Sequence, residues 1–242
     1  GNAQGRGENW YLRTAYRPEV PLMTSVAPLI RQSDLAVLGT LHQRVGDELT
    51  VNEGSELAHE NRVWGRMIGK SSDLTLNDQV GSKLNAHMTG LQVGVDVYSN
   101  RNWKAGFYTS VMDVNSNVVG DFSGSRGTAG SIDSNSLYLG GYATYTADND
   151  FYLDSVLQYG NHSIDVNLKT GSTNYHPDGN TLMASLEMGK PFRIAESAWR
   201  IEPQAQIIYQ YSNFDSIALS GNSNTTASMD SDDSVIGRLG VR

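Results

Sequence analysis

Most of the chain alternates between apolar and polar residues. In residues 199–210, Ile201, Ala205 and Ile207 fall on one face, and Glu202 and Gln206 fall on the other. Because successive side chains of a β-strand point to opposite sides of a sheet, this period of two predicts a strand with one apolar and one polar face. The same pattern recurs in eight segments: 61–69, 88–99, 102–114, 135–147, 151–166, 180–190, 197–212 and 233–242.

The length of these segments and the connections between them favour a membrane barrel. Strands of globular proteins average five or six residues, whereas a tilted membrane-spanning strand needs about nine to eleven. Short connections near Asn100, at 148–150 and at 191–196 alternate with long polar ones, such as 115–134 and 213–232. Alternation of this kind is typical of outer-membrane barrels with tight periplasmic turns. The sequence therefore predicts an antiparallel up-and-down transmembrane β-barrel.

A soluble β-sandwich that acts as a binding module is an alternative, because its strands also alternate. A sandwich, however, gives no reason for sorting short and long connections by parity, and its polar face needs no glycines. The mean hydropathy of −0.40 is compatible with a barrel, because only every second residue of a spanning strand faces lipid.

The residues before the strands follow a helical period instead. Leu22, Val26, Leu29, Ile30, Val37, Leu38 and Leu41 recur at helical spacing. We predict one helix over residues 23–44, in which Pro28 introduces a kink or delays the start. Such a helix is roughly 30 Å long, close to the thickness of the hydrocarbon layer. If the first strand begins at the periplasmic side, the route from this helix to anything displayed outside runs through the barrel. A helix packed on the sheet or lying in the membrane interface is the alternative.

The inward-facing polar residues are the candidate site residues. We predict that the pore is lined by Arg66, Gln92, Asp96, Lys104, Tyr108, Asp154, Glu187, Arg200, Glu202, Gln204, Gln206 and Arg238. In the helix, the residues that plug the pore are Arg31, Leu38 and Arg44. The acids among the pore residues could pair with Arg31 or Arg44, or keep the lumen hydrated, and we favour a structural role for them.

Charge and composition exclude several kinds of chemistry. The net charge of −8 argues against a nucleic-acid partner. There are no cysteines, and the five histidines show no metal-ligand spacing. No G-x-S-x-G motif occurs. We therefore predict no catalytic residues, no metal and no cofactor. An outer-membrane lipase or protease with a loop-borne site is the alternative function, and His162 with Asp165 is its nearest candidate pair.

Four blocks of sequence carry a resemblance to a known family. They are "NWYLRTAYRPEVPLMTSVAPLIRQSDLAVLGTLHQRVG", "RVWGRMIG", "FYLDSVLQYG" and "WRIEPQAQIIYQ". Together they resemble the translocator (β) domain of classical, type Va autotransporters, which include the diffuse-adherence adhesins. The resemblance implies a twelve-stranded barrel with a helix in its pore, which lets an attached N-terminal passenger reach the cell surface.

The same resemblance divides the chain into three parts. It implies a passenger or autochaperone tail at 1–18, a pore-traversing linker helix at 19–45, and a barrel at 46–242. About eight strands are present, and because eight strands enclose room for side chains only, four more are expected elsewhere. Self-cleavage in this family uses an Asn in the helix, and residues 23–44 contain none, so that chemistry is not carried over.

The resemblance also implies where the protein works and with what. We expect a non-enzymatic domain in the outer membrane of a Gram-negative bacterium, with its N-terminus toward the cell surface. The expected partners are its own passenger, outer-membrane lipid and the barrel-assembly machinery.

Overall fold

The structure is a computed structural model that describes residues 16–45, 63–169, 174–193, 200–218, 226–227 and 231–242. Its helices are α1 (Glu19–Leu38) and α2 (Leu41–Val45). The long strands are β1 (Val63–Thr75), β2 (Lys83–Ser99), β3 (Trp103–Phe122), β4 (Ser125–Thr146), β5 (Tyr152–Leu168), β7 (Asp178–Gly189), β10 (Pro203–Phe214) and β13 (Asp232–Val241). The short strands are β6 (Asn174–Tyr175), β8 (Phe192–Arg193), β9 (Arg200–Ile201), β11 (Ile217–Ala218) and β12 (Thr226–Ala227). Each of the eight predicted strand segments overlaps one long strand, and several of these strands extend beyond the predicted bounds.

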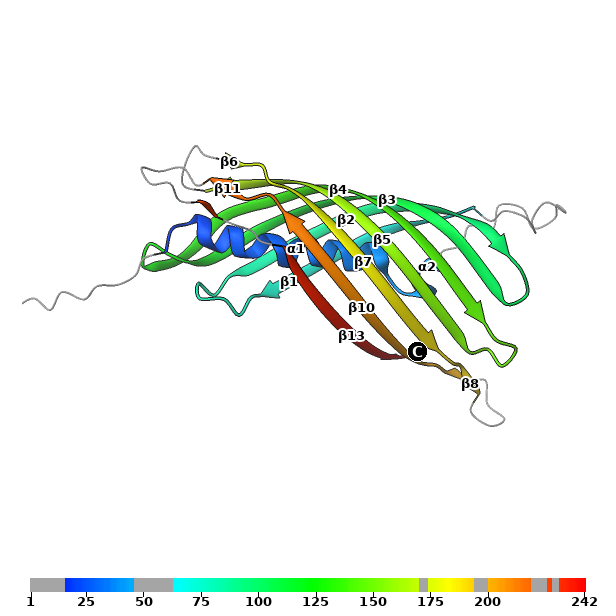
Figure 1. Ribbon diagram of the computed structural model, residues 1–242. Coiled ribbons are helices and arrows are strands. Elements are labelled where there is room, and N and C mark those ends of the chain that lie inside the picture. Colours follow the sequence, from blue (N-terminus) through cyan, green and yellow to red (C-terminus); the bar gives the residue numbers. More distant parts are fainter. Residues whose placement is uncertain (1–15, 46–62, 170–173, 194–199, 219–225, 228–230) are drawn as a thin grey trace, which may run out of the picture.

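The eight long strands form one antiparallel up-and-down sheet. Its order is β1-β2-β3-β4-β5-β7-β10-β13, so every long strand pairs with its neighbours along the chain. The sheet curves around α1, which lies along the concave side (Figure 1). Among the described residues β1 and β13 pair with one strand each, which leaves a half-barrel with two free edges. The predicted fold class, an antiparallel barrel sheet around an N-terminal helix, is confirmed.

A band of large apolar side chains covers the convex face. It includes Met67, Leu91, Val93, Val97, Phe107, Val111, Leu137, Leu139, Leu157, Leu186, Ile207 and Leu239, all exposed. The register aligns them from strand to strand, for example Leu91 opposite Val111 and Val111 opposite Leu137. At one rim the rings of Trp103 and Tyr145 lie 5.1 Å apart, as in an aromatic girdle. A continuous apolar surface of this extent marks contact with lipid rather than water.

The position of this band gives a test of the lipid-facing surface. We expect Leu139→Arg to destabilise the barrel by roughly 2–4 kcal/mol, because it places a charge near the middle of the apolar band. Asn135→Arg is the matched control, since Asn135 is exposed on the same face of β4 but beyond the band. The difference is measured by unfolding the two variants, each made in the full-length protein and inserted in lipid vesicles. Equal losses of unfolding free energy would contradict the assignment of the lipid-facing surface.

The segment predicted as a long polar loop, residues 115–134, is not a loop. Strand β3 continues to Phe122 and β4 begins at Ser125, so only Ser123 and Gly124 turn, with φ of 52° and 79°. Polar residues of this stretch, such as Asn117 and Asp121, are exposed. Apolar residues between them, such as Val118 and Ile132, face inward together with Ser116 and Ser134. The period of two continues with its faces exchanged, and the predicted parity of short and long connections is therefore wrong.

The same exchange of faces changes the interior. From the middle of the sheet to the β3–β4 turn, buried residues line the concave wall: Leu84, Ala86, Met88, Met112, Val114, Val118, Ile132, Ile164 and Met183. They belong to one apolar cluster with Leu22, Val26, Leu29 and Ile30 of α1. A polar lumen along the whole sheet, which the sequence pattern suggested, is therefore wrong for this half. The helix fills the space, so the wall there packs as a dry core.

The helix differs from its predicted bounds at both ends. It begins at Glu19 and ends at Leu38, and Gly39, with φ of 62°, separates it from α2. The Gly39 N–H donates to the carbonyl of Leu35 at 3.1 Å, and a left-handed glycine after the last helical residue is a common helix stop. A single helix over residues 23–44 is therefore wrong. Neither helix in the described part of the chain is both long and apolar enough to cross a bilayer.

Glycines on the concave face make room for aromatic rings. A Cβ at Gly94 would lie 2.4 Å from the Trp64 ring, and one at Gly140 would lie 2.1 Å from the Tyr108 ring. The sequence suggested that such glycines admit the helix. At these two positions the glycines instead make room for an aromatic ring of the neighbouring strand. The ring packs against the wall, so the space beside the sheet remains available for α1.

Candidate functional site

The contacts between the helices and the concave wall form the candidate site. Between α2 and β5, Arg44 and Asp154 make a buried ion pair, with Nη2 and Oδ1 2.5 Å apart. Asp154 also accepts a hydrogen bond from Thr144 Oγ1 at 2.6 Å. The Arg44 guanidinium lies 4.5 Å from the centre of the Tyr142 ring. Among the described residues, Asp154 is the inward acid that forms an ion pair with Arg44.

Two further acids hold α2. The main-chain N–H of Leu41 donates to Glu187 Oε2 at 3.1 Å, and Tyr152 donates to Glu187 Oε1 at 2.9 Å. His42 Nε2 lies 2.5 Å from Glu202 Oε1. Carboxylates that accept from helix N–H groups satisfy donors that a helix start leaves unpaired. Glu187 and Glu202 therefore fix this end of the helical segment to the wall.

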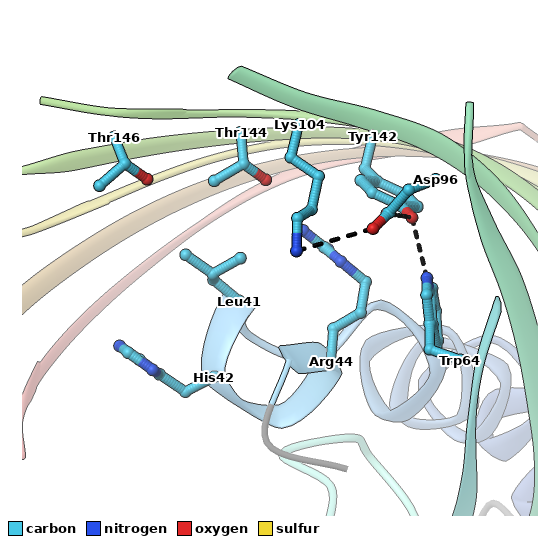
Figure 2. Close-up of a pocket in the computed structure, with 9 residues that line it drawn as sticks. All are labelled: Leu41, His42, Arg44, Trp64, Asp96, Lys104, Tyr142, Thr144 and Thr146. Carbon is cyan, nitrogen blue, oxygen red and sulfur yellow. Dashed lines mark hydrogen bonds and ion pairs between the residues drawn. The ribbon is translucent and has the colours of Figure 1, made fainter. Parts of the chain in front are cut away.

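A cavity of about 200 Å³ lies between α2 and the wall. Figure 2 shows Lys104 pointing toward Asp96, and the distance between Nζ and Oδ2 is 3.6 Å. Trp64 Nε1 donates to the Tyr142 hydroxyl at 2.8 Å, and that hydroxyl donates to Asp96. Polar and charged groups surround this cavity, but the described residues hold no cluster of three or more His, Cys, Asp or Glu side chains that suits a metal ion.

The wall also caps the end of α1. Arg66 donates to Gln92 Oε1 at 2.5 Å and to the Val37 carbonyl, and Gln92 Nε2 donates to the same carbonyl at 3.2 Å. Gln206 Nε2 donates to the carbonyl of Gly39 at 3.2 Å. The last carbonyls of a helix have no partner within the helix. Three wall residues supply partners here, so the helix end is bound at one depth.

The structure places the other predicted site residues as follows. Tyr108 is buried and donates to Gln158 at 2.7 Å, Gln204 donates to Glu202 at 3.1 Å, and Arg238 lies 3.5 Å from Gln206 Oε1. The side chain of Arg200 lies outside the described residues. In α1, Leu38 is buried, and Arg31 contacts Gln210 at 3.2 Å and Asp232 at 3.3 Å. Their role in lining or plugging a pore stays a prediction.

Sequence reasoning missed a polar cluster in the last two turns of α1. Asp34 is fully buried, and its Oδ2 accepts from Gln210 Nε2 at 2.5 Å. Its Oδ1 lies 3.4 Å from His162 Nε2. The neighbouring Ser33 hydroxyl lies 2.8 Å from that of Tyr138. The available signal was one carboxylate between apolar residues of a helix face.

The pair that the enzyme alternative required is not formed. His162 points inward and contacts Ser136 at 2.8 Å and Thr181 at 2.9 Å, whereas Asp165 points outward and contacts His176. Residues three apart on a strand lie on opposite faces. Ser136, His162 and Asp34 do lie together, but all three are buried, so an external substrate has no access to them.

At the other end of α1, two turns of the sheet hold the start of the helix. Ser123 N donates to the Tyr16 carbonyl at 2.9 Å, and the Tyr16 hydroxyl donates to Gln79 at 2.7 Å. Thr24 Oγ1 donates to Asp78 Oδ2 at 2.9 Å. The chain upstream of α1 therefore emerges beside the β1–β2 and β3–β4 turns.

The contact of Asp78 gives a pH prediction. Burial raises the pKa of Asp78, but hydrogen bonds from Ser82 and Thr24 outweigh it, so the pKa lies below the ordinary value of 3.8. A carboxyl with a depressed pKa stabilises the fold above its unfolded-state pKa, and this contribution is lost as the pH falls through the folded-state pKa. We expect hydrogen exchange at residues 19–25, corrected for intrinsic rates, to quicken below about pH 4. In Asp78→Ala this step should be absent, and a step of unchanged size would exclude Asp78 as its cause.

An up-and-down antiparallel sheet with an outward apolar band and a helix on its concave side defines a membrane β-barrel of the outer-membrane type. Comparison with known proteins gives the family. The family model described as "Autotransporter beta-domain" matches residues 63–242. The chain belongs to this family, and it is an outer-membrane translocator domain.

Individual relatives and solved structures agree with this assignment. The adhesin BmaC autotransporter of Brucella suis is 28% identical over 267 residues, which cover 96% of this chain and 8% of the relative. The pertactin autotransporter of Bordetella bronchiseptica is 29% identical over 152 residues, which cover 60% of this chain and 15% of the relative. The chain thus spans a small part of these relatives.

Two solved structures share the fold. The translocator domain of the autotransporter NalP from Neisseria meningitidis superposes with a TM-score of 0.59 at 16% identity, covering 90% of this chain and 70% of that one. The β domain of the Bordetella autotransporter BrkA gives a TM-score of 0.57 at 23% identity, covering 75% and 69%.

Proposed function

We propose that this domain anchors an autotransporter in the outer membrane and lets its N-terminal passenger reach the cell surface through the space that α1 occupies. The observation that carries the proposal is the path of α1 along the concave side of a lipid-facing sheet (Figure 1). The chain enters this space at α2 and leaves it at Tyr16, beside the β1–β2 and β3–β4 turns. A polypeptide that follows this path crosses the membrane once inside the barrel.

The orientation follows from the same path. The upstream chain leaves next to Ser123, so this end faces the cell surface if the passenger is displayed. The turns at 100–102 and 147–151 lie at the opposite end and would face the periplasm. The partners that fit this arrangement are the passenger, outer-membrane lipid against the apolar band, and the barrel-assembly machinery during insertion. The domain acts as a conduit and anchor without catalysis of its own.

Single-cysteine labelling in the cysteine-free chain tests this proposal. Ser125→Cys lies at the β3–β4 turn and Asn149→Cys at the β4–β5 turn, and both residues are exposed. We expect a membrane-impermeant maleimide to label Cys at 125, but not at 149, in intact cells that produce the full-length parent. After the outer membrane is permeabilised both should label. Labelling of 149 alone would reverse the orientation, and equal labelling of both in intact cells would contradict the membrane topology.

Ser33→Cys tests the helix position in the same cells. Ser33 is fully buried between α1 and β4. We expect no labelling at 33 in the folded protein and labelling after denaturation. Free labelling at 33 in intact cells would mean that the space inside the sheet is open and that α1 does not fill it.

A further inference from the structure

The buried cluster around Asp34 is a feature that an anchor and conduit does not require. Asp34 lies in the last two turns of α1 and is fully buried. Its carboxylate meets Gln210 of β10 and His162 of β5, and Gln158 of β5 donates to its main-chain carbonyl at 3.2 Å. His162 is held in turn by Ser136 of β4 and Thr181 of β7. Four wall strands therefore converge on one turn of the helix.

The surroundings of this cluster are apolar. One turn toward the helix start lies Ile30, one turn toward its end lies Leu38, and both are buried. Apolar wall residues such as Met112 and Ile164 are buried in the apolar cluster that includes both of these helix residues. Apolar contacts are not directional. These apolar contacts therefore do little to distinguish one axial position of the helix from the next. The depth is set by polar contacts, at the ends of the helical segment and at Asp34.

A buried carboxylate, in contrast, does distinguish between axial positions of the helix. Burial of a charged or polar group without a hydrogen-bond partner is costly. A shift of α1 by one turn, about 5.4 Å, would remove the carboxylate from Gln210 and His162. It would bring Ile30 or Leu38 to those wall groups instead, and a three-residue shift would bring Arg31 or Val37. Among residues 30–38 at these spacings, Asp34 is the one acid.

We propose that Asp34 is a positioning residue which ends the outward movement of the chain by meeting Gln210 and His162 at one depth of the barrel. This inference rests on the proposed function, in which the chain moves outward through the sheet. Buried polar groups that fix register are known in helical assemblies, where a single polar residue selects one alignment. Here the partners are a helix and a barrel wall.

Disulfide cross-linking in the full-length parent reads the depth directly. A Cβ at Gly120 would lie 2.7 Å from Pro21 Cβ, so Pro21→Cys and Gly120→Cys need only a small adjustment to reach disulfide spacing. If α1 moved outward by one turn, residue 25 would take the place of residue 21. Ser25→Cys with Gly120→Cys therefore reports the shifted position. We expect the 21–120 cross-link, and not the 25–120 cross-link, in the otherwise unchanged protein.

In Asp34→Leu the preference for one depth should weaken, because only the polar contacts at the ends of the helical segment then oppose a shift. We expect the 21–120 yield to fall and the 25–120 cross-link to appear, because no register then supplies an acceptor to Gln210. Asp34→Asn should restore the original pattern, since an amide can accept from Gln210 and donate to His162. Gln32→Leu is the matched control. It removes a polar side chain from the same region of α1, but the partner of Gln32 is Lys70 of β1, which takes no part in the cluster, so the pattern should not change.

A transposed variant keeps the test decisive if Asp34→Leu fails to assemble. Asp34→Leu combined with Leu38→Asp moves the carboxylate one turn along the helix, and we expect the 25–120 cross-link to become the main product. An unchanged 21–120 pattern in Asp34→Leu, or in the transposed variant, overturns the proposal while the helix stays inside the barrel. Absence of the 21–120 cross-link in the otherwise unchanged protein would instead contradict the proposed function itself.

Discussion

Replacing Arg44 with methionine is expected to destabilise the folded domain by about 3–5 kcal/mol, because breaking a buried ion pair leaves a charge without compensation. The side chains of Arg44 and Asp154 are 4% and 3% exposed. Without Arg44, Asp154 keeps the hydrogen bond from Thr144 but loses its counter-charge. Chemical unfolding of the full-length parent in lipid vesicles measures the loss.

Two controls separate this effect from a general loss of charge. Arg101 and Asp148 form an ion pair at 3.2 Å with side chains 82% and 74% exposed, and Arg101→Met should cost at most about 1 kcal/mol. Combining Arg44→Met with Asp154→Leu removes both buried charges and should recover much of the loss. If Arg101→Met and Arg44→Met cost the same, the Arg44–Asp154 pair is not buried as described.

Deleting residues 19–45 is expected to open the barrel of the full-length parent. The helix fills the concave side of the sheet, so its loss should raise single-channel conductance in planar bilayers. It should also lower the unfolding temperature, since wall residues such as Leu84, Met88 and Met112 would lose their apolar partners to water. The matched control is Arg31→Leu, which keeps the helix and should keep the low conductance. Unchanged conductance after the deletion would mean that α1 does not occupy the pore.

The strand pattern was predictable wherever lipid and water lie on opposite sides of the sheet. Ile207 and Tyr209 are exposed on the convex face while Gln206 and Gln210 are buried, as the alternation of residues 199–210 indicated. Lipid on one side and water on the other are enough to set this alternation, so it can be recognised in the sequence of a single strand. The apolar residues of α1 were predictable for the same reason, because one helix face must be covered.

The alternation led to a wrong prediction where the convex face of the sheet meets water and its concave face meets the helix. At residues 115–134 most outward residues are polar and most of the large inward ones, such as Val118 and Ile132, are apolar, so the pattern of a spanning strand inverts. Low overall hydrophobicity then resembles a loop, and only the partner of the inward face, α1, explains the strand. The helix stop at Gly39 depends in the same way on wall contacts from Arg66, which lie far away in the sequence.

The candidate site was predictable in its residue types but not in its pairings. The inward acids could be named from the strand alternation and Arg44 from the helical segment, whereas the choice of Asp154 as the partner of Arg44 depends on the axial depth of α2. Asp34 was not singled out, because one acid on an apolar helix face has no local partner in the sequence. Its partners come from β5 and β10, more than 120 residues downstream.

The apolar sleeve around the first half of α1 has a consequence for the energy of export. Seven apolar side chains of α1 become buried once the helix is in place: Leu22, Val26, Leu29, Ile30, Leu35, Val37 and Leu38. At roughly 1.5–3 kcal/mol each, their burial stabilises the seated helix by about 10–20 kcal/mol as an upper bound. In the proposed function, seating the helix is thus itself a downhill step that favours forward over backward movement of the chain.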